Sequence, residues 1–224
     1  MSFYETLSDK IVTTVPAQYD MQKDVYNQCS WFAFCMAAAL KKNKWKIPKL
    51  NNLASMYKKA LQQATKLRVE NNCCPWGESI FSSIIHETLP LNTSIPYSTV
   101  VNINKKPNLL LHPSMEHIQA YKETLSSKSE LDLYKQIKNL NGENNFMFVN
   151  RYGQSFLIYP FGEKYYIFDS HCRECGIFSY ESVIKYLHEG HDDTYNFIIW
   201  IVGSMDSWSK SNYVIDKFFY DYEE

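Results

Sequence analysis

The chain has 224 residues, of which 45% are hydrophobic and 21% are charged, and its formal net charge is -1. These values are typical of one globular domain with a real core, and they give no reason to expect a polyanion partner such as DNA. The first 14 residues lack the basic start and apolar run of a signal peptide. No apolar stretch reaches the ~20 residues that span a bilayer. We therefore expect a cytoplasmic protein with no nucleic-acid or membrane partner.

The cysteine content indicates free thiols rather than a disulfide scaffold. In a chain of this length six cysteines are too few for such a scaffold. A reducing compartment permits a reactive cysteine, and we expect no cofactor. The six are Cys29, Cys35, Cys73, Cys74, Cys172 and Cys175.

The first half of the sequence predicts helices. Residues 1–24 are expected to form an irregular lead-in. The run from Cys29 to about Lys42 is rich in Ala, Leu and Met and apolar almost all round, which predicts a buried helix. Apolar residues from about Leu50 to Val69 follow the 3.6-residue period of a second helix. A third helix is predicted from about Glu78 to Leu89.

The middle of the chain is less regular. Prolines between residues 90 and 113 indicate loops around a short strand, Tyr97 to Ile103. One or two helices are predicted between Ser114 and Leu140. The segment from Asn139 to Asn145 is a turn cluster.

The last third of the chain predicts a sheet. Three short β-type runs, residues 145–152, 155–161 and 164–171, are separated by turn signals and indicate an antiparallel meander. A helix from about Tyr180 to Glu189 and a strand from Tyr195 to Val202 are expected to follow. Helices first and an antiparallel sheet second indicate the α+β class.

We expect the whole chain, residues 1–224, to form a single domain. Its two ends, residues 1–15 and 208–224, are expected to be peripheral.

Cys29 is the candidate nucleophile. It stands at the predicted first turn of the buried helix, where free N–H groups and the helix dipole favour a thiolate. Taken alone, a cysteine at such a position is more often a small core residue. Cys35, deeper in the same helix, is expected to belong to the core.

Asp169 and His171 are the candidate acid and base. Positions i and i+2 of a strand face the same way, so the carboxylate and the imidazole are expected to be neighbours. Asp169 can orient the ring while His171 takes a proton from a thiol. The alternative is a strand-end turn in which Asp169 is a cap.

Gln18 is the candidate donor for an oxyanion. Thiol-dependent hydrolysis of a carbonyl compound needs hydrogen-bond donors aimed at the negatively charged oxygen of the intermediate. The backbone N–H of the nucleophile can supply one donor and an upstream amide a second. Gln22, Asn27 and Gln28 compete with Gln18 for this role.

Together these motifs resemble those of the herpesvirus tegument deubiquitinases and the wider group of viral tegument-like deubiquitinases. The acid and base one residue apart are the most telling feature. Ser170 and Cys172 depart from the proline and glycine common in that family. The similarity covers roughly residues 16 to 202, and its motifs are Gln18-x-Asp20, Asn27-Gln28-Cys29 and Phe168-Asp169-x-His171-x-Arg173.

The resemblance implies a papain-like cysteine protease that removes ubiquitin. It assigns Cys29 as nucleophile, His171 as base, Asp169 as orienting acid and Gln18 as oxyanion donor. It also implies ubiquitin or polyubiquitin conjugates as partners, and we expect a monomer acting in the cytoplasm, a host cytoplasm or a virion.

Two other classes of function stay open. The chain could be an inactive ubiquitin-binding module, or a thiol hydrolase that acts on a ubiquitin-like modifier or another peptide. A structural zinc site is a weaker alternative, because adjacent Cys73 and Cys74 cannot easily both bind one metal ion. Its other possible ligands are His171, Cys172 and Cys175.

Overall fold

The computed structural model describes residues 3–21, 28–70, 130–151, 154–188 and 198–210, which form helices and an antiparallel sheet. This confirms the α+β class. The helices are α1 (Phe3–Leu7), α2 (Gln18–Met21), α3 (Cys29–Lys42), α4 (Leu50–Glu70), α7 (Glu130–Asn139), α8 (Tyr180–His188) and α9 (Met205–Lys210). The strands are β1 (Lys10–Thr14), β2 (Asn145–Arg151), β3 (Gln154–Phe161), β4 (Lys164–Phe168), β5 (Glu174–Phe178) and β6 (Ile198–Ser204).

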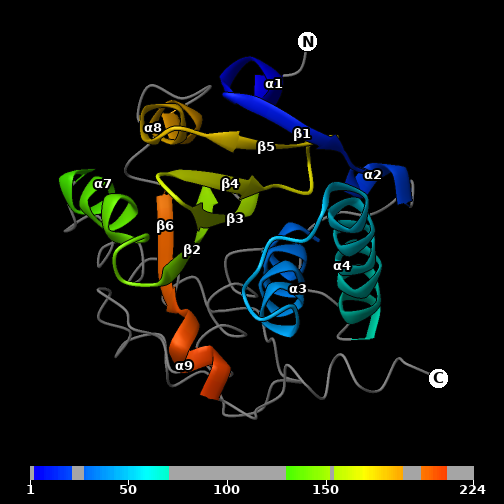
Figure 1. Ribbon diagram of the computed structural model, residues 1–224. Helices are drawn as coiled ribbons and strands as arrows, with labels where there is room; N and C mark the ends of the chain where they lie inside the picture. Colours follow the sequence, from blue (N-terminus) through cyan, green and yellow to red (C-terminus); the bar gives the residue numbers. More distant parts are fainter. Residues whose placement is uncertain (1–2, 22–27, 71–129, 152–153, 189–197, 211–224) are drawn as a thin grey trace, which may run out of the picture.

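The six strands form one sheet in the order β1-β5-β4-β3-β2-β6, and each pair is antiparallel (Figure 1). The register places Phe148 of β2 opposite Leu157 of β3 on one side and Ile201 of β6 on the other. β4 is an inner strand of the sheet, paired with β3 on one side and with β5 on the other.

Helices cover both faces of the sheet, and each face has its own hydrophobic cluster (Figure 1). Side chains alternate along β2: Phe148 packs with α3 and α4, whereas Met147 and Val149 pack with α7 and α8. This is the period of two that a strand requires when both its faces are buried. The sheet therefore separates two hydrophobic clusters, one on each face.

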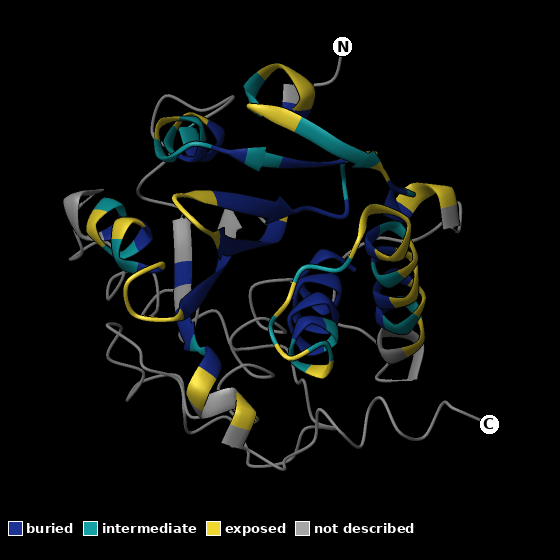
Figure 2. Ribbon diagram, in the orientation of Figure 1, coloured by how far each residue is buried: buried dark blue, intermediate teal, exposed yellow. Residues whose placement is uncertain are grey.

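Helix α3 lies against the sheet and is buried along almost its entire length (Figure 2). Its composition explains this, because apolar residues occur all round the helix and leave few polar side chains for solvent. Lys41 and Lys42 stand in the last turn, where cations interact favourably with the helix dipole. The N–H of Asn43 donates to the carbonyl of Ala39 and closes the helix.

The hairpin between β3 and β4 is an ordinary solvent-exposed turn. Gly162 has φ +62°, a left-handed conformation that costs glycine little. At the first residue of β4, Lys164 Nζ donates to Asp9 Oδ2 at 2.9 Å, and both side chains are partly exposed. Phe161, the last residue of β3, is 47% exposed.

Several predictions from the sequence are confirmed. α3 begins at Cys29 and ends at Lys42 as predicted, and α4, α8 and the β2–β4 meander lie where expected. Cys35 is fully buried, in agreement with a core role.

The N-terminal lead-in was predicted wrongly. Residues 3–21 form α1, the edge strand β1 and α2. Tyr4 is buried, and its hydroxyl donates to the carbonyl of Ile167 in β4, so these residues are integral to the fold rather than peripheral. β5 was missed because it is a five-residue strand containing Gly176. That glycine is needed for packing, since a Cβ there would lie 3.0 Å from the carbonyl oxygen of Lys10.

Other predictions fall outside the described residues. They are the helix at 78–89, the strand at 97–103, most of the region between 114 and 140, and the tail after residue 210. Among the described helices, none combines the length and the apolar character needed to cross a membrane.

Candidate active site

The site is built where β4 ends. The strand stops at Phe168, and the next residues form a turn in which the N–H of Cys172 donates to the carbonyl of Asp169 at 3.1 Å. Asp169 and His171 therefore lie on this turn, not on the strand as the period-of-two argument predicted. We call residues 169–172 the β4–β5 turn.

The turn still brings the acid and the base together. His171 Nδ1 lies 2.7 Å from Asp169 Oδ1, and the backbone N–H of His171 donates to the same oxygen at 2.9 Å. The tight turn thus does what strand alternation was expected to do, since it folds the ring back onto the carboxylate. With Nδ1 engaged by Asp169, the other ring nitrogen is available to a reacting group.

Cys29 reaches the same imidazole from the first turn of α3. Its side chain is hydrogen-bonded to His171, although the two residues stand on separate elements. Burial would lower the pKa of His171, but the charge of Asp169, the hydrogen bond to Asp169 and the hydrogen bond to Cys29 raise this pKa to about 11. The ring is therefore cationic at neutral pH and lies beside the sulfur atom of Cys29.

Two buried tyrosines hold Asp169 in place. The hydroxyl of Tyr186, from α8, donates to Asp169 Oδ2 at 2.6 Å. The hydroxyl of Tyr57, from α4, donates to the backbone carbonyl of Asp169 at 2.5 Å. Burial raises the pKa of both tyrosines, so both stay protonated donors.

These contacts keep the buried acid ionised. Burial would raise the pKa of Asp169, but the charge of His171 and the hydrogen bonds from His171 and Tyr186 lower this pKa below its usual range. Neither tyrosine was predicted to belong to the site. Neither Tyr57 nor Tyr186 belongs to a local motif, and only the packing of α4 and α8 brings them to the turn.

Gln18 lies against the residue between the acid and the base. Its backbone N–H donates to the carbonyl of Ser170 at 2.7 Å, and Ser170 Oγ donates to Gln18 Oε1 at 2.9 Å. Both side chains are buried. The structure thus brings all four predicted site residues, Cys29, His171, Asp169 and Gln18, to one place.

The other three predicted amides, Gln22, Asn27 and Gln28, are not seen beside the acid and the base in the described structure. Gln28 Nε2 donates to the carbonyl of Leu61, and Gln28 Oε1 accepts from Thr65, so this side chain is turned toward α4 and fixes the start of α3. Gln22 and Asn27 lie outside the described residues. Of the four predicted amides, Gln18 is the one that the described structure joins to the β4–β5 turn, through Ser170. Gln154, which the sequence did not indicate, is a further amide that lines a cavity with Asp169 and His171.

A two-pronged ion pair joins two of the predicted motifs. Arg173 Nε and a terminal guanidinium nitrogen of Arg173 donate to the two carboxylate oxygens of Asp20 at 3.1 and 2.6 Å. The hydrogen bond from Arg173 is the main reason that the pKa of Asp20 is lowered to about 2. Because the N–H of Val15 also donates to the carbonyl of Arg173, residues on both sides of Gln18 are bonded to the residue that directly follows the β4–β5 turn.

A cavity of about 400 Å³ opens beside the acid and the base. Asp169 and His171 line it together with Tyr19, Gln154 and Tyr186. The ring of Tyr19 is 52% exposed, and its centroid lies 6.1 Å from that of His171. An exposed aromatic side chain at the rim can contact a bound chain, and the sequence offered no signal for it beyond its place next to Gln18.

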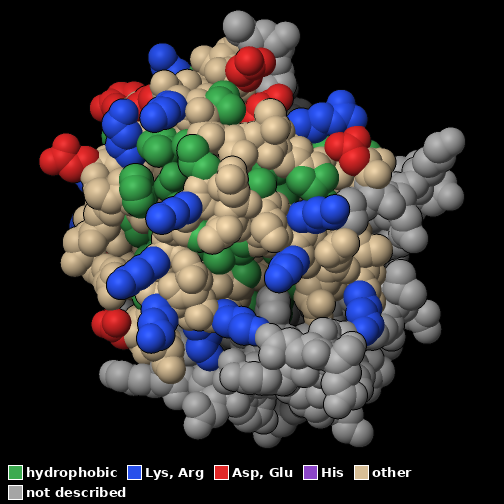
Figure 3. Space-filling model, turned by 45° about the vertical axis from the view of Figure 1, so that its right-hand side comes forward, with side chains coloured by type: hydrophobic (Ala, Val, Ile, Leu, Met, Phe, Trp, Pro, Cys, Tyr) green, Lys and Arg blue, Asp and Glu red, His purple; other side chains and the backbone are tan. Residues whose placement is uncertain are grey.

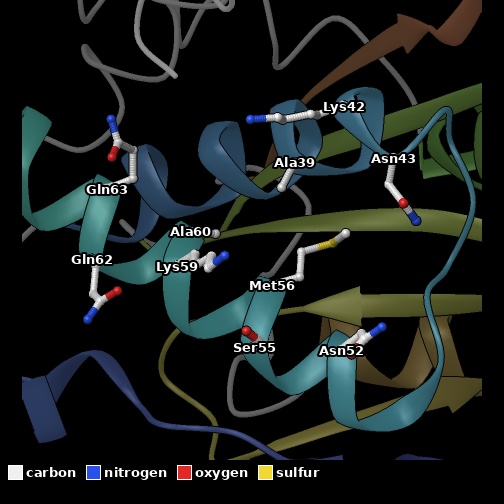
Figure 4. Close-up of a pocket in the computed structure, with 10 residues that line it drawn as sticks. All are labelled: Ala39, Lys42, Asn43, Asn52, Ser55, Met56, Lys59, Ala60, Gln62 and Gln63. Carbon is white, nitrogen blue, oxygen red and sulfur yellow. The ribbon is translucent and has the colours of Figure 1, made fainter. Parts of the chain in front are cut away.

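A second, polar groove of about 590 Å³ runs between α3 and α4 (Figure 4). Figure 3 shows many Lys and Arg side chains on the face that it presents, with acidic side chains near the top and the edges of the view. The described lining of this groove contains amides, lysines, Met56 and small residues, but no thiol or imidazole. Of the four predicted site residues, Asp169 and His171 line the cavity at the β4–β5 turn, whereas Cys29 and Gln18 are in the described lining of neither cavity.

Of the four cysteines considered as zinc ligands, the structure describes two. Cys73 and Cys74 lie outside the described residues, and neither Cys172 nor Cys175 forms a disulfide bond in the described part of the chain. Cys175 is buried in β5, and burial raises its pKa to about 12. Within the described part of the chain, no group of three or more His, Cys, Asp or Glu side chains is placed to hold a metal ion.

Comparison with known proteins adds no relative. No family model, no curated protein and no solved structure matches this chain. The roles of Cys29, His171, Asp169 and Gln18 are thus argued from their chemistry and from the resemblance of the motifs.

Proposed function

We propose that this chain is a papain-like cysteine protease that removes ubiquitin from its conjugates. The observation that carries the proposal is the chain of contacts Cys29–His171–Asp169, in which a thiol, an imidazole and a carboxylate from two elements are hydrogen-bonded in sequence. This order of groups is what activation of a sulfur nucleophile requires. The motif resemblance supplies the substrate class.

The local electrostatics support an imidazolium ring beside the sulfur of Cys29. Asp169 is buried, ionised and held by Tyr186, so its charge acts on the ring with little screening by solvent. The start of α3 adds the positive end of a helix dipole at Cys29. The imidazolium and the helix terminus thus place positive charge beside the sulfur, and the carboxylate keeps the imidazole cationic.

The reaction then proceeds in two halves. The Cys29 thiolate attacks the carbonyl carbon of the last glycine of ubiquitin, and N–H groups at the helix start and Gln18 stabilise the oxyanion. The bond to the lysine nitrogen breaks as the imidazolium of His171 gives its proton to that amine. Water next attacks the thioester, and His171 accepts a proton from it. The ubiquitin carboxylate leaves, Cys29 returns to the thiolate beside the imidazolium, and the second proton of the water passes to solvent.

The burial of the Cys29 sulfur supports a substrate whose reacting end has no bulky side chains. Cys29 is 1% exposed, and the side chain of His171 is 18% exposed. A group set this deeply is reached most readily by a chain without side chains at the reacting end. A tail that ends in two glycines, as the ubiquitin tail does, meets this requirement.

A reactive ubiquitin with an electrophilic C-terminus tests the proposal directly. The protein is incubated with the probe, and the adduct is detected by its mass and mapped by peptide sequencing. We expect one ubiquitin added at Cys29, and no adduct in Cys29→Ala. Cys35→Ala is the matched control, because Cys35 lies on the same helix but burial raises its pKa far above the working pH. This variant is expected to react like the wild type.

Each alternative gives a different result. Binding of ubiquitin without an adduct and without cleavage would indicate a binding module and overturn the proposal. Reaction with a probe built on a ubiquitin-like modifier, but not with the ubiquitin probe, would indicate a different thiol hydrolase. An adduct that persists in Cys29→Ala would overturn the assignment of the nucleophile.

A further inference from the structure

Ser170 stands between the acid and the base, and two hydrogen bonds join it to Gln18. The backbone bond, from Gln18 N–H to the Ser170 carbonyl, measures 2.7 Å and fixes where the residue lies. The side-chain bond, from Ser170 Oγ to Gln18 Oε1, measures 2.9 Å and links residues 152 positions apart in the sequence. Position and orientation of Gln18 are therefore controlled separately.

The orientation of a glutamine amide matters more at an oxyanion site than elsewhere. The two ends of the amide have nearly the same size, so packing alone does not choose between them, and hydrogen bonds decide. An amino group facing the reacting carbonyl would donate to the developing negative charge. A carbonyl oxygen in the same place would repel it.

Ser170 is suited to make this choice. Its side chain is fully buried, and so is that of Gln18 apart from 1% of its surface. When the hydroxyl donates to Oε1, the carbonyl end of the amide is satisfied away from the reaction, and Nε2 remains as the end that can donate. Without the hydroxyl, Oε1 would be buried without this donor in the productive orientation, which costs free energy and favours rotation of the amide.

We propose that Ser170 is a positioning residue for the reaction: its hydroxyl selects the orientation of Gln18 in which the amide nitrogen serves the oxyanion. This inference rests on the proposed function, because it acts on the same reaction. It assigns a role to the position at which the sequence departs from the resembling family. The serine is not expected to touch the substrate.

The test uses a double-mutant cycle on the full chain. The rate constant kcat and kcat/KM are measured with a fluorogenic ubiquitin substrate for wild type, Ser170→Ala, Gln18→Ala and the double variant. We expect Ser170→Ala to lower kcat about tenfold with little change in KM, since one hydrogen bond holds the orientation. Gln18→Ala should cost roughly 10²–10³-fold. In the Gln18→Ala background, Ser170→Ala should then change nothing further.

Ser155→Ala is the matched control for the loss of a buried hydroxyl. Ser155 Oγ lies 2.7 Å from Ser30 Oγ, on α3, whereas the side-chain hydrogen bond of Gln18 is made with Ser170. Any effect of this substitution should multiply with that of Gln18→Ala instead of disappearing. Melting temperatures of all variants show whether the fold is kept.

Alkylation of Cys29 by iodoacetamide separates orientation of the amide from damage to the nucleophile. This displacement passes through no oxyanion, so Ser170→Ala should alkylate at the wild-type rate. A tenfold loss in alkylation as well would mean that the serine supports the thiol–imidazole pair, and would overturn the inference. So would multiplicative effects of Ser170→Ala and Gln18→Ala.

The two proposals fail in different ways. An active wild type whose rate is matched by Ser170→Ala overturns the role of the serine and leaves the protease intact. A folded wild type with neither adduct nor cleavage overturns both.

Discussion

The two ends of β4 are built from the same kind of connection but differ in every other respect. At the Lys164 end, a hairpin with Gly162 faces solvent, and one ion pair with Asp9 joins it to the rest of the molecule. At the Asp169 end, side chains from four helices converge on a turn of four residues. The first connection needs only to reverse the chain.

The comparison shows that a buried turn with a charged side chain needs many more specific contacts than an exposed turn. A turn in water needs a residue that tolerates a left-handed conformation, and little else. A buried turn carrying a carboxylate needs a partner for each polar atom, because an unpartnered charge away from water costs several kcal/mol. The convergence of hydrogen bonds on Asp169 is the physical mark of a site under that requirement.

The largest effect is expected from paired changes of the acids at the two ends. Asp169→Asn should lower kcat/KM on the order of 10⁴-fold, the size seen when the acid of a hydrolase triad becomes an amide. Asp9→Asn should leave the rate within about twofold, because Asp9 touches the surface lysine Lys164 and a serine on α8. Fluorogenic ubiquitin kinetics check both. Equal losses in the two variants would show that the ends of β4 do not differ in function.

The dependence of stability on pH provides the second test. The pKa of His171 is raised in the folded protein, so its contribution to the free energy of unfolding is full below about pH 6.5 and is lost as the pH rises toward about 11. The free energy of unfolding of the wild type, minus that of His171→Gln, should therefore decrease from pH 6.5 to 9. The decrease should be at most about 1.4 kcal/mol per pH unit.

Denaturant titrations of both proteins at pH 6, 7.5 and 9 measure this difference. The lowered pKa of Asp169 acts at the opposite end of the scale, since its contribution is present above about pH 4 and is lost in acid. A difference that stays constant between pH 6 and 9 would show that the imidazole is not held as a cation.

Tyrosine hydroxyls at the two ends give a smaller contrast. Tyr186→Phe removes the donor to Asp169, whereas Tyr165→Phe removes a buried hydroxyl that donates to the carbonyl of Ile137 at 3.1 Å. Each should cost about 1–3 kcal/mol in the free energy of unfolding, because a buried acceptor loses its partner. Only Tyr186→Phe should also lower kcat, by about tenfold. Loss of activity in Tyr165→Phe alone would reverse the comparison.

The smallest effect is expected at the exposed ion pair. Lys164→Met should change the free energy of unfolding by less than about 1 kcal/mol, because pairs between partly exposed side chains contribute little. Thermal unfolding at low and high salt provides the measurement. A cost of several kcal/mol would mean that the hairpin is coupled to the core after all.

The sequence predicted the elements whose signal is local. α3 was found because its apolar residues are continuous, and the meander was found because its strands are separated by turn residues. β1 and β5 escaped prediction because their sequences carry no clear strand pattern, and they are defined by pairing at the end of the sheet, β1 with β5 and β5 with β4. Each forms a strand because it pairs with a segment far away in the sequence, and a short stretch of sequence does not reveal that partner.

The candidate site divides in the same way. Cys29, Gln18, Asp169 and His171 stand in short motifs and were named from residue type and spacing. Their meeting place, a turn and not a strand, could not be read from alternation.

The supporting groups needed the tertiary structure. Tyr57 lies 112 residues from Asp169, and Tyr186 approaches it by the packing of α8. Long-range partners of this kind leave no periodic trace in the sequence.

The pairing of Gln18 with Ser170 across 152 residues has a consequence for the newly made protein. During synthesis the nucleophile emerges early and the imidazole late, so a ribosome-bound fragment carries the sulfur without its proton acceptor. The contacts of the candidate site can be completed only after residue 171 has left the ribosome. On the proposed function, a shorter nascent fragment holds its thiol without the imidazole that activates it.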